Sequence, residues 1–415
     1  MLKTKIFIVC ALLLFATQGN GFSLEKSNYS FEQILSAELL NQTITCVYKD
    51  HSGYVWIGTN NGLFKYDGNS FKIYRTQTYD PTSICSNKIY AIYEDIKNVL
   101  CVLSEESSTY NRYNSTYDNF SRYSYNTKSL TYPYPIPDNK KKAKFLCTRE
   151  AIYQYIPRKG KFERIILNTD YNVPDINSYV EDAEGKLWIG SFTIGLLKYD
   201  PIKKKLISYP TKNNSYLSDC RILDLFYDSQ GYIWIGGLRD AINCFDPKKE
   251  KYVKTWSSKN NGQKINISVW NFCEDNLGKI WMSSAQGINI YDKKQDEFVV
   301  VKTNPAQEGS LFSNNIKILY KDQTDKIWIG IDGAIQMYDP YRVKFRNLLQ
   351  TYTDNEKLNK SFKSAFKDSK GNLWIGTDLG LNKFDKNGNL TKTYISNNKN
   401  IKSIDEGGVC AILEN

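Results

Sequence analysis

The sequence predicts an all-β protein, a seven-bladed β-propeller of four-stranded blades followed by the first blade of a second, truncated propeller. Three observations predict it: a phrase that recurs along the chain, its nearly constant spacing, and turn signals between short apolar runs. The phrase is an acidic residue, a turn that usually contains glycine, and a strand that reads apolar-Trp-Ile-Gly. A fixed period of this length indicates stacked supersecondary units.

Tryptophan marks six of the units clearly. They are the units of Trp56, Trp188, Trp234, Trp281, Trp328 and Trp374, and the last five tryptophans lie 46, 47, 47 and 46 residues apart. The interval between the first two has room for two eroded units, in which Cys101 and Phe145 stand in place of the tryptophan. The sequence therefore predicts eight units, with spacings of 43 to 47 residues.

Each unit is predicted to hold four strands. The first is the apolar run before the acidic residue, as in 316–321; the second carries the tryptophan; the third and fourth follow, as in 62–66 and 70–74. An Asp with a Gly three residues later suits the ends of a type I turn. Short strands with turns at this spacing indicate a propeller blade.

The N-terminal residues predict export. Lys3 and Lys5 precede an apolar run at 6–16 and small or polar residues through Gly21, which is the pattern of a signal peptide at 1–21. The run is too short to span a bilayer. We therefore expect an exported protein.

Two similar stretches, 31–35 and 345–349, predict the domain boundary. They indicate a seven-bladed propeller at 22–344 and the first blade and start of the next blade of a second propeller at 345–415. Residues near 24–36 are expected to supply the outer strand of the blade of Trp328 and so close the ring. A single eight-bladed ring is the alternative. Residues 408–415 match 88–95, which open a unit, so the sequence is expected to be a fragment of a longer array.

The repeats resemble those of the two-component regulator propeller family. The segments 56–67 and 374–385, both Trp-Ile-Gly-Thr followed by Gly-Leu and a Tyr or Phe before Asp, carry the resemblance, as does the inter-blade segment 310–315. The resemblance implies the periplasmic sensor region of a hybrid histidine kinase, with a ligand derived from a polysaccharide. It also implies a homodimeric parent in the inner membrane, whose membrane segment and kinase parts are absent here.

No catalytic or metal-binding residue and no cofactor is predicted. The single histidine, His51, falls in a turn, which excludes a His-rich zinc site and argues against a Ser-His-Asp triad. The cysteines form no Cys-x-x-Cys pair; they are interpreted as small buried side chains, with disulfides as the alternative in an exported protein.

The charge pattern bears on partners. The formal net charge is +11, but most of the basic residues are Lys spread through predicted turns, which does not suggest a nucleic-acid surface. Attraction of anionic sugars stays an alternative to a merely solvated surface.

A binding role is predicted for the loops between the second and third strands and the loops that join blades, because these share one face of a propeller. Aromatic and charged side chains there suit a sugar. The candidate ligand-binding residues are Phe192, Tyr216, Arg239, Asp240 and Trp270. The resemblance, the export signal and the missing catalytic residues together imply oligosaccharide sensing as the function. The alternatives are an exported polysaccharide lyase or glycosidase and a protein-interaction scaffold.

Overall fold

The chain is described by a computed structural model that covers residues 29–95, 97–105, 109–124, 133–134, 145–148, 152–156, 161–165, 176–209, 221–238, 241–257, 265, 268–342, 362–378, 380–385, 390–395 and 408–414. Every sheet in these residues has four antiparallel strands. None of these residues lies in a helix long and apolar enough to cross a lipid bilayer. The chain divides into two compact units, residues 1–340 and 341–415.

The described residues of the first unit hold seven sheets, which we number along the chain. From the inner strand outwards, sheet 1 contains β2 (Ile44–Lys49), β3 (Val55–Thr59), β4 (Gly62–Tyr66) and β5 (Phe71–Tyr74). Sheet 2 contains β6 (Ile89–Glu94), β7 (Leu100–Ser104), β8 (Thr109–Asn114) and β9 (Asn119–Ser124). Sheet 3 contains β10 (Pro133–Tyr134), β11 (Phe145–Thr148), β12 (Ile152–Ile156) and β13 (Lys161–Ile165).

Sheets 4 to 7 repeat the same order. Sheet 4 contains β14 (Ile176–Glu181), β15 (Leu187–Ser191), β16 (Gly195–Asp200) and β17 (Lys205–Tyr209), and sheet 5 contains β18 (Ile222–Tyr227), β19 (Ile233–Gly237), β20 (Ala241–Asp246) and β21 (Lys251–Ser257). Sheet 6 contains β22 (Asn271–Glu274), β23 (Ile280–Ser284), β24 (Gly287–Asp292) and β25 (Glu297–Val301). Sheet 7 contains β26 (Ile316–Lys321), β27 (Ile327–Ile331), β28 (Ala334–Tyr338) and β1 (Phe31–Ile34).

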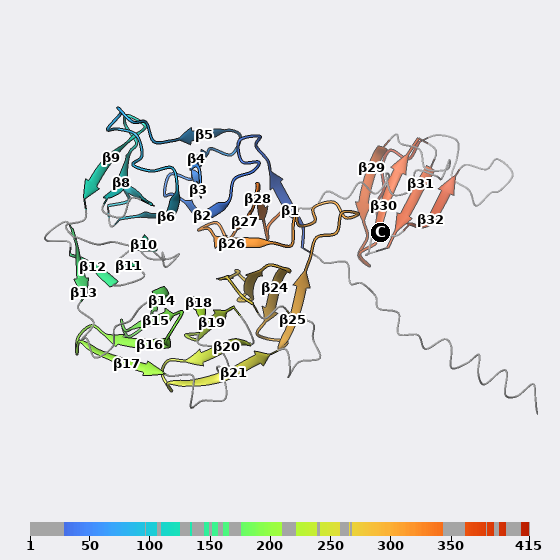
Figure 1. The fold of residues 1–415 in the computed structure, drawn as a ribbon. Coiled ribbons are helices and arrows are strands. Elements are labelled where there is room, and N and C mark those ends of the chain that lie inside the picture. The colour runs from blue at the N-terminus through green and yellow to red at the C-terminus, as the bar shows by residue number, and fades with distance from the viewer. Residues whose placement is uncertain are drawn as a thin grey trace, which may run out of the picture. The chain divides into compact units, whose positions relative to one another are not determined.

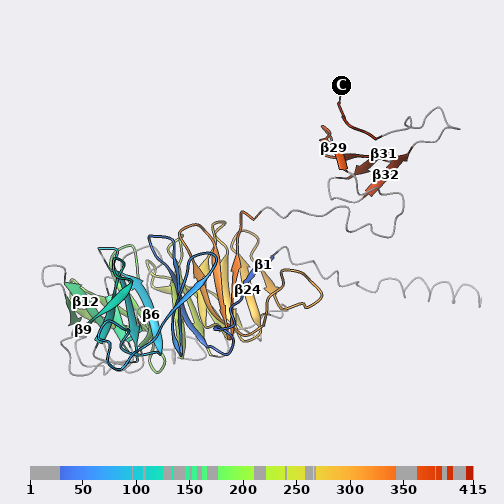
Figure 2. The same ribbon diagram turned by 90° about the horizontal axis from the view of Figure 1, so that it is seen from above.

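The seven sheets stand around a common axis (Figure 1), and Figure 2 shows the same ring from its edge, with the strands crossing its thickness. Consecutive sheets contact each other around the whole ring, through β2 and β6, β6 and β10, β11 and β14, β14 and β18, β18 and β22, β22 and β26, and β26 and β2. This arrangement confirms the predicted all-β propeller class.

The ring is closed by β1. Phe31 to Ile34 pair antiparallel with Tyr338 to Ile335 of β28, so the first described strand becomes the outer strand of the last sheet. Joining the two ends of the array in one sheet leaves no blade incomplete. The predicted closing strand near 24–36 is therefore confirmed.

Strand pairing also identifies the eroded units. Trp56 lies opposite Lys65 on the third strand of sheet 1. Cys101 lies opposite Arg112 in sheet 2, and Phe145 lies opposite Gln154 in sheet 3. These are equivalent pairs, so Cys101 and Phe145 occupy the tryptophan position, as predicted.

Each boundary between neighbouring sheets encloses its own apolar cluster in the described residues. Between sheets 1 and 2, for example, Trp56, Ile89 and Val102 are fully or almost fully buried. Glycine after the Trp-Ile pair is required where the next inner strand comes close: a Cβ on Gly58 would lie 2.8 Å from Cγ2 of Ile89. The repeated phrase thus encodes inter-blade packing.

The acidic residue of the phrase holds the turn and the tryptophan together. In sheet 5, Asp228 accepts the backbone N–H groups of Gln230 and Tyr232 with one oxygen, and the indole N–H of Trp234 at 2.9 Å with the other. Gly231 takes a φ of +87°, which explains the preference for glycine there. The same indole bond recurs with Asp50, Asp182, Asp275, Asp322 and Asp368.

The second unit contains one described sheet, made of β29 (Phe362–Lys367), β30 (Leu373–Thr377), β31 (Gly380–Phe384) and β32 (Leu390–Ile395). Residues 408–414 lie against it: Val409 N donates to Thr377 O at 3.0 Å, and Ser369 N donates to Glu414 at 2.8 Å. In the first unit, β22 and the residues before it bond to sheet 5 in the same way. Residues 408–414 thus lie where a following sheet would begin.

Some sequence predictions lie outside the described residues. These are the signal peptide at 1–21 and the domain boundary at residues 344 and 345. The Tyr-rich sequence from Tyr110 to Tyr134 is interpreted as the outer strands of the eroded blades rather than as a glycan platform, and for Tyr134 this interpretation is wrong. Tyr110 lies on β8 and Tyr123 on β9, but Tyr134 lies on β10, the inner strand of sheet 3.

Candidate functional site

One face of the ring is formed by the loops between second and third strands and by the connections that join consecutive sheets. In sheet 1 these two loop types bond to each other, because Gly62 N donates to Asn87 O at 2.7 Å and Arg75 Nε donates to Asn61 O at 3.2 Å. The Asp-centred turns lie at the opposite ends of the strands. We call the face formed by the strand loops and the sheet connections the loop face. It is the face predicted to bind a ligand.

A polar cavity of about 560 Å³ opens on the loop face at the boundary of sheets 1 and 2. It is lined by Asn60, residues 76–78 and 85–88, Glu105 and Arg122. Amides, hydroxyls and three charged groups dominate this lining, and the size lies in the range of small-molecule sites. The arrangement can donate and accept several hydrogen bonds at once.

Local hydrogen bonds fix the connection that forms this cavity. Thr76 N donates to Asn87 Oδ1 at 2.8 Å, and Gln77 N donates to Ser83 Oγ at 3.0 Å. The guanidinium of Arg122 donates to the backbone oxygens of Ser83 and Ile84. The cavity wall is therefore held by β9 of sheet 2 as well as by its own turns.

A buried amide supports the connection that lines the cavity. Cys85 N donates to the side-chain oxygen of Asn111 at 2.9 Å, and the amide nitrogen of Asn111 lies 3.2 Å from Cys85 Sγ. Asn111 is fully buried on β8. A buried amide on a third strand therefore positions the connection from below.

The charged groups of the cavity are partly paired. Lys88 Nζ lies 2.8 Å from Glu105 Oε1, and Tyr90 OH donates to the same oxygen at 3.3 Å. The hydrogen bond from Lys88 to Glu105 raises the pKa of Lys88 and lowers that of Glu105. Arg122 contacts backbone carbonyls and the Ser83 hydroxyl. The lining therefore carries two cations and one carboxylate.

The structure places two of the five predicted ligand residues. Phe192 lies half-buried in the loop between β15 and β16. Trp270 lies half-buried just before β22, with Lys317 Nζ 4.8 Å from its ring centroid. Both are on the loop face but in sheet 4 and sheet 6, away from the cavity lining. Tyr216, Arg239 and Asp240 lie outside the described residues, so the predicted set stays a prediction.

Sequence reasoning missed the cavity residues, although a signal was present. The segment 310–315, noted as an inter-blade motif, has a counterpart at 83–88 with Ser and Asn at the same places. The two differ conservatively at Ile84 against Leu311, and more strongly at Cys85 against Phe312 and at Lys88 against Asn315. Comparing the two segments would have drawn attention to the connection that forms the cavity.

The single histidine has a structural place. His51 follows Asp50 in its turn, and both its backbone N–H and its Nδ1 lie within hydrogen-bond distance of Glu94 Oε1, at 3.1 and 2.5 Å. In sheet 5, Ser229 makes the equivalent contact with Glu274. Within the described residues no group of three or more His, Cys, Asp or Glu side chains forms a metal site.

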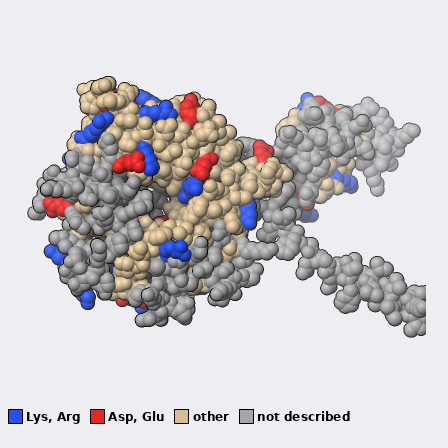
Figure 3. Space-filling view, viewed as in Figure 1, with Lys and Arg blue, Asp and Glu red and all other residues tan. Residues whose placement is uncertain are grey.

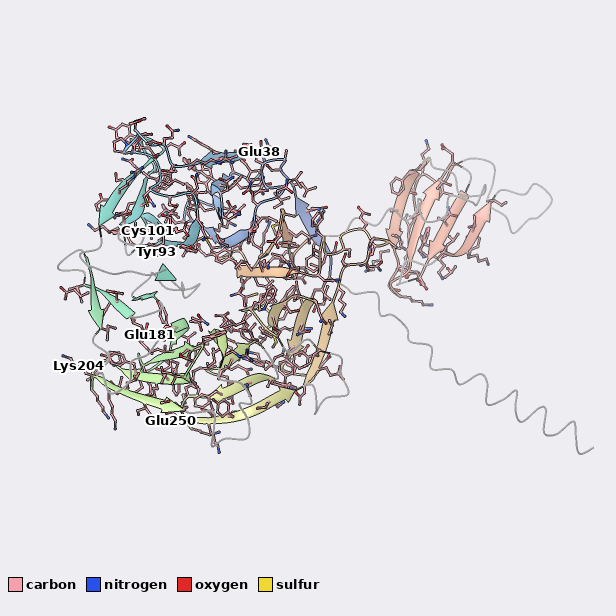
Figure 4. The ribbon with its side chains drawn as sticks, in the orientation of Figure 1. Glu38, Tyr93, Cys101, Glu181, Lys204 and Glu250 are labelled. Atoms are coloured by element: carbon pink, nitrogen blue, oxygen red, sulfur yellow. The ribbon has the colours of Figure 1, made fainter. Side chains whose placement is uncertain are left out.

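The charged groups visible on the ring are mixed in sign. Figure 3 shows Lys and Arg interspersed with Asp and Glu rather than gathered in one patch. Lys204 and Glu250, in the turns before β17 and β21, lie at the outer rim, whereas Tyr93 and Cys101 belong to sheet 2 (Figure 4).

Comparisons with known proteins agree with this architecture. The model of the family described as "Two component regulator propeller" matches residues 38–61, 216–239 and 357–378. A protein named Histidine kinase P4, from Formosa agariphila, is 35% identical over 77 residues, which are 18% of this chain and 6% of that protein.

Among solved structures, two similar ones from B. thetaiotaomicron are named as the extracellular domains of hybrid two-component systems. They have TM-scores of 0.63 and 0.61 with 23% and 22% identity, and the match covers 88% and 89% of this chain but 49% and 48% of theirs. This chain thus spans about half the length of those structures.

A virginiamycin B lyase from Staphylococcus aureus is also similar, with a TM-score of 0.58, 8% identity and coverage of 75% of this chain and 99% of that one. At these identities the structural likenesses establish the propeller fold alone. The family match and the repeated geometry agree: the three matched segments are repeats of the two-component regulator propeller type.

Proposed function

We propose that this chain is the ligand-sensing propeller of a two-component signalling receptor and that it binds a polysaccharide-derived oligosaccharide on its loop face. The family of the repeats and the names of the similar extracellular domains support a sensing role outside the cytoplasm. The observation that carries the ligand class is the polar cavity between sheets 1 and 2.

Sugars suit this cavity because their hydroxyls both donate and accept hydrogen bonds. Asn60, Thr78 and Ser86 offer neutral partners of both kinds, and Tyr79, which is 97% exposed beside the lining, offers an aromatic face at the rim. The periplasmic location, a homodimeric parent and its anchoring in the inner membrane are parts of the same proposal. Ligand binding would shift the arrangement of such a receptor.

Calorimetry of the full chain against a panel of oligosaccharides tests the proposal. At least one member should bind, and Thr78→Trp, which fills the cavity from an exposed position, should weaken that binding at least about tenfold. The matched control is Pro305→Trp, at the equivalent exposed position of the connection between sheets 6 and 7, which should leave binding unchanged.

Other outcomes point elsewhere. If no sugar binds, the sensing proposal fails. If the chain cleaves a glycan of the panel, the function is enzymatic instead. Binding that is lost in Trp270→Ala but kept in Thr78→Trp would move the site to the neighbourhood of the predicted Trp270.

A further inference from the structure

The connection between sheets 1 and 2 has a structural twin, the connection between sheets 6 and 7. Thr76 N bonds to Asn87 Oδ1 at 2.8 Å, and Thr303 N bonds to Asn314 Oδ1 at 2.8 Å. Below each connection a buried amide accepts a backbone N–H: Asn111 from Cys85 and Gln336 from Phe312. The two connections thus share one hydrogen-bonded scaffold.

The side chains at several equivalent positions around the two connections differ in charge. Lys88 corresponds to Asn315, and Asn60 corresponds to Ala285, four residues after the tryptophan position in each sheet. Arg122, opposite Asn111, corresponds to Gln33, opposite Gln336. The first cavity therefore has two cations at positions where the twin has neutral amides.

The acidic residue, in contrast, is kept around both connections. Glu105 corresponds to Asp332, and each pairs with a lysine, Lys88 in the first case and Lys317 at 3.9 Å in the second. Arg122 thus remains as the excess positive charge of the first cavity. Arg122 also bonds to the backbone of its connection, but the twin forms the same kind of connection with the neutral Gln33 at this position. We therefore attribute the positive charge itself to what the cavity binds.

The ion pair in the cavity is open to exchange. The side chains of Lys88 and Glu105 are 43% and 44% exposed, and ion pairs exposed to this degree contribute little net stability. An anionic group that enters the cavity can therefore take Lys88 from Glu105 at small cost. Its own charge would then be met by Lys88 and Arg122 together.

We propose that this cavity recognises an anionic oligosaccharide, one that carries a carboxylate or a sulfate, with Lys88 and Arg122 facing the negative group. This inference rests on the proposed function and makes it more specific. Glu105 acts as the internal competitor that the ligand displaces from Lys88.

Calorimetry of the full chain with matched tetrasaccharides tests the inference: neutral galactotetraose, tetragalacturonate and sulfated galactotetraose. The acidic members should bind at least about tenfold more tightly than the neutral one at low salt, and the difference should shrink as NaCl is raised. The carboxylated and sulfated arms distinguish the two kinds of anion.

Three variants locate the effect. Lys88→Asn, which installs the twin's side chain, should weaken binding of the acidic member about 5- to 10-fold, and Glu105→Gln should strengthen it a few-fold. Asn315→Ala, at the same position of the twin, should change nothing. Thermal unfolding of each variant checks that the fold is intact.

The failures are distinguishable. Equal or tighter binding of galactotetraose overturns the inference and leaves the proposed function standing. An acidic preference that Lys88→Asn and Glu105→Gln do not alter also overturns it, because the charge is then read elsewhere. If none of the three sugars binds, the inference falls, and the broad panel decides whether the proposed function falls with it.

Discussion

At the scale of single residues, the bond between an aspartate and an indole recurs in every unit that kept its tryptophan. Asp182 Oδ2 accepts the indole N–H of Trp188 at 2.8 Å, and both groups are buried. The other oxygen of Asp182 caps its turn. One side chain therefore satisfies a buried donor and orders the turn that leads into the strand.

Trp188→Phe removes the indole N–H as well as part of the ring, and a buried carboxylate oxygen then loses its donor. The lost hydrogen bond should lower the free energy of unfolding by about 1–3 kcal/mol, in addition to the cost of the smaller ring. Urea unfolding followed by circular dichroism measures this. The control is Trp256→Phe, since no aspartate bonds to that indole among the described residues. Equal costs for the two variants would contradict the assigned role.

Ser283 lies two residues after Trp281, at the position where most units have the glycine of the Trp-Ile-Gly phrase. Its hydroxyl is buried, and no partner for it is found in the described part of the chain. Ser283→Ala should therefore stabilise the protein by about 1 kcal/mol. At the same place in sheet 1, Gly58→Ala should destabilise it by about 1–3 kcal/mol, since the Cβ would lie 2.4 Å from Cys46 Sγ.

Unfolding midpoints in urea compare these two variants directly. Stabilisation by Gly58→Ala, or loss of stability in Ser283→Ala, would mean that the packing between neighbouring sheets is looser than described.

At the scale of elements, β1 holds the ring closed from both sides. Phe31 packs in the cluster between sheets 6 and 7, and Ile34 packs in the cluster between sheets 7 and 1. Alternate faces of one short strand therefore serve two boundaries, as expected from the twofold alternation of side chains.

Phe31→Ala should cost about 3–5 kcal/mol of stability and expose the chain N-terminal to β2 to protease. Phe71→Ala, on the half-buried outer strand β5, is the matched control and should cost clearly less. Urea unfolding and limited proteolysis provide the readouts. If Phe31→Ala behaves like its control, β1 does not close the ring.

A buried carboxyl links three inner strands. Asp224 on β18 accepts the side-chain N–H of Asn271 and the backbone N–H of Phe272, both at 3.1 Å, and Asn271 in turn accepts Leu319 N at 2.8 Å. Burial raises the pKa of Asp224 to about 7. The folded state therefore favours the neutral carboxyl.

Stability should consequently fall as pH rises. The stabilisation due to protonated Asp224 is complete below about pH 4, the ordinary range of an aspartate, and is lost as pH passes through about 7. Urea midpoints at pH 5 and pH 8 measure this loss. Asp224→Asn should make the two midpoints more similar; an unchanged difference would show that Asp224 is ionised throughout.

The elements were largely predictable because the repeat encodes packing. The Asp, Gly and Trp positions each satisfy a fixed contact, so they recur at a fixed spacing, and even Cys101 and Phe145 were assigned from that spacing. Tyr134 was misassigned because sheet 3 has lost the phrase that marks an inner strand. The eroded sequence there no longer distinguishes inner from outer strands.

At the scale of the whole molecule, the cavity could not be predicted in the same way. Its lining comes from five separate segments, Asn60, residues 76–78, residues 85–88, Glu105 and Arg122, and all but Arg122 lie in loops. Loop positions carry no period, so only the folded ring brings them together. Comparing equivalent connections within one chain recovers part of that information.

The central claim is that ligand binds on the loop face between sheets 1 and 2. Amide hydrogen exchange of the full chain, with and without the oligosaccharide that binds most tightly in calorimetry, tests it most directly. The account predicts slower exchange in residues 76–88 and no change in the twin connection at 303–315. Protection at 303–315 or around Trp270, with 76–88 unaffected, would contradict it.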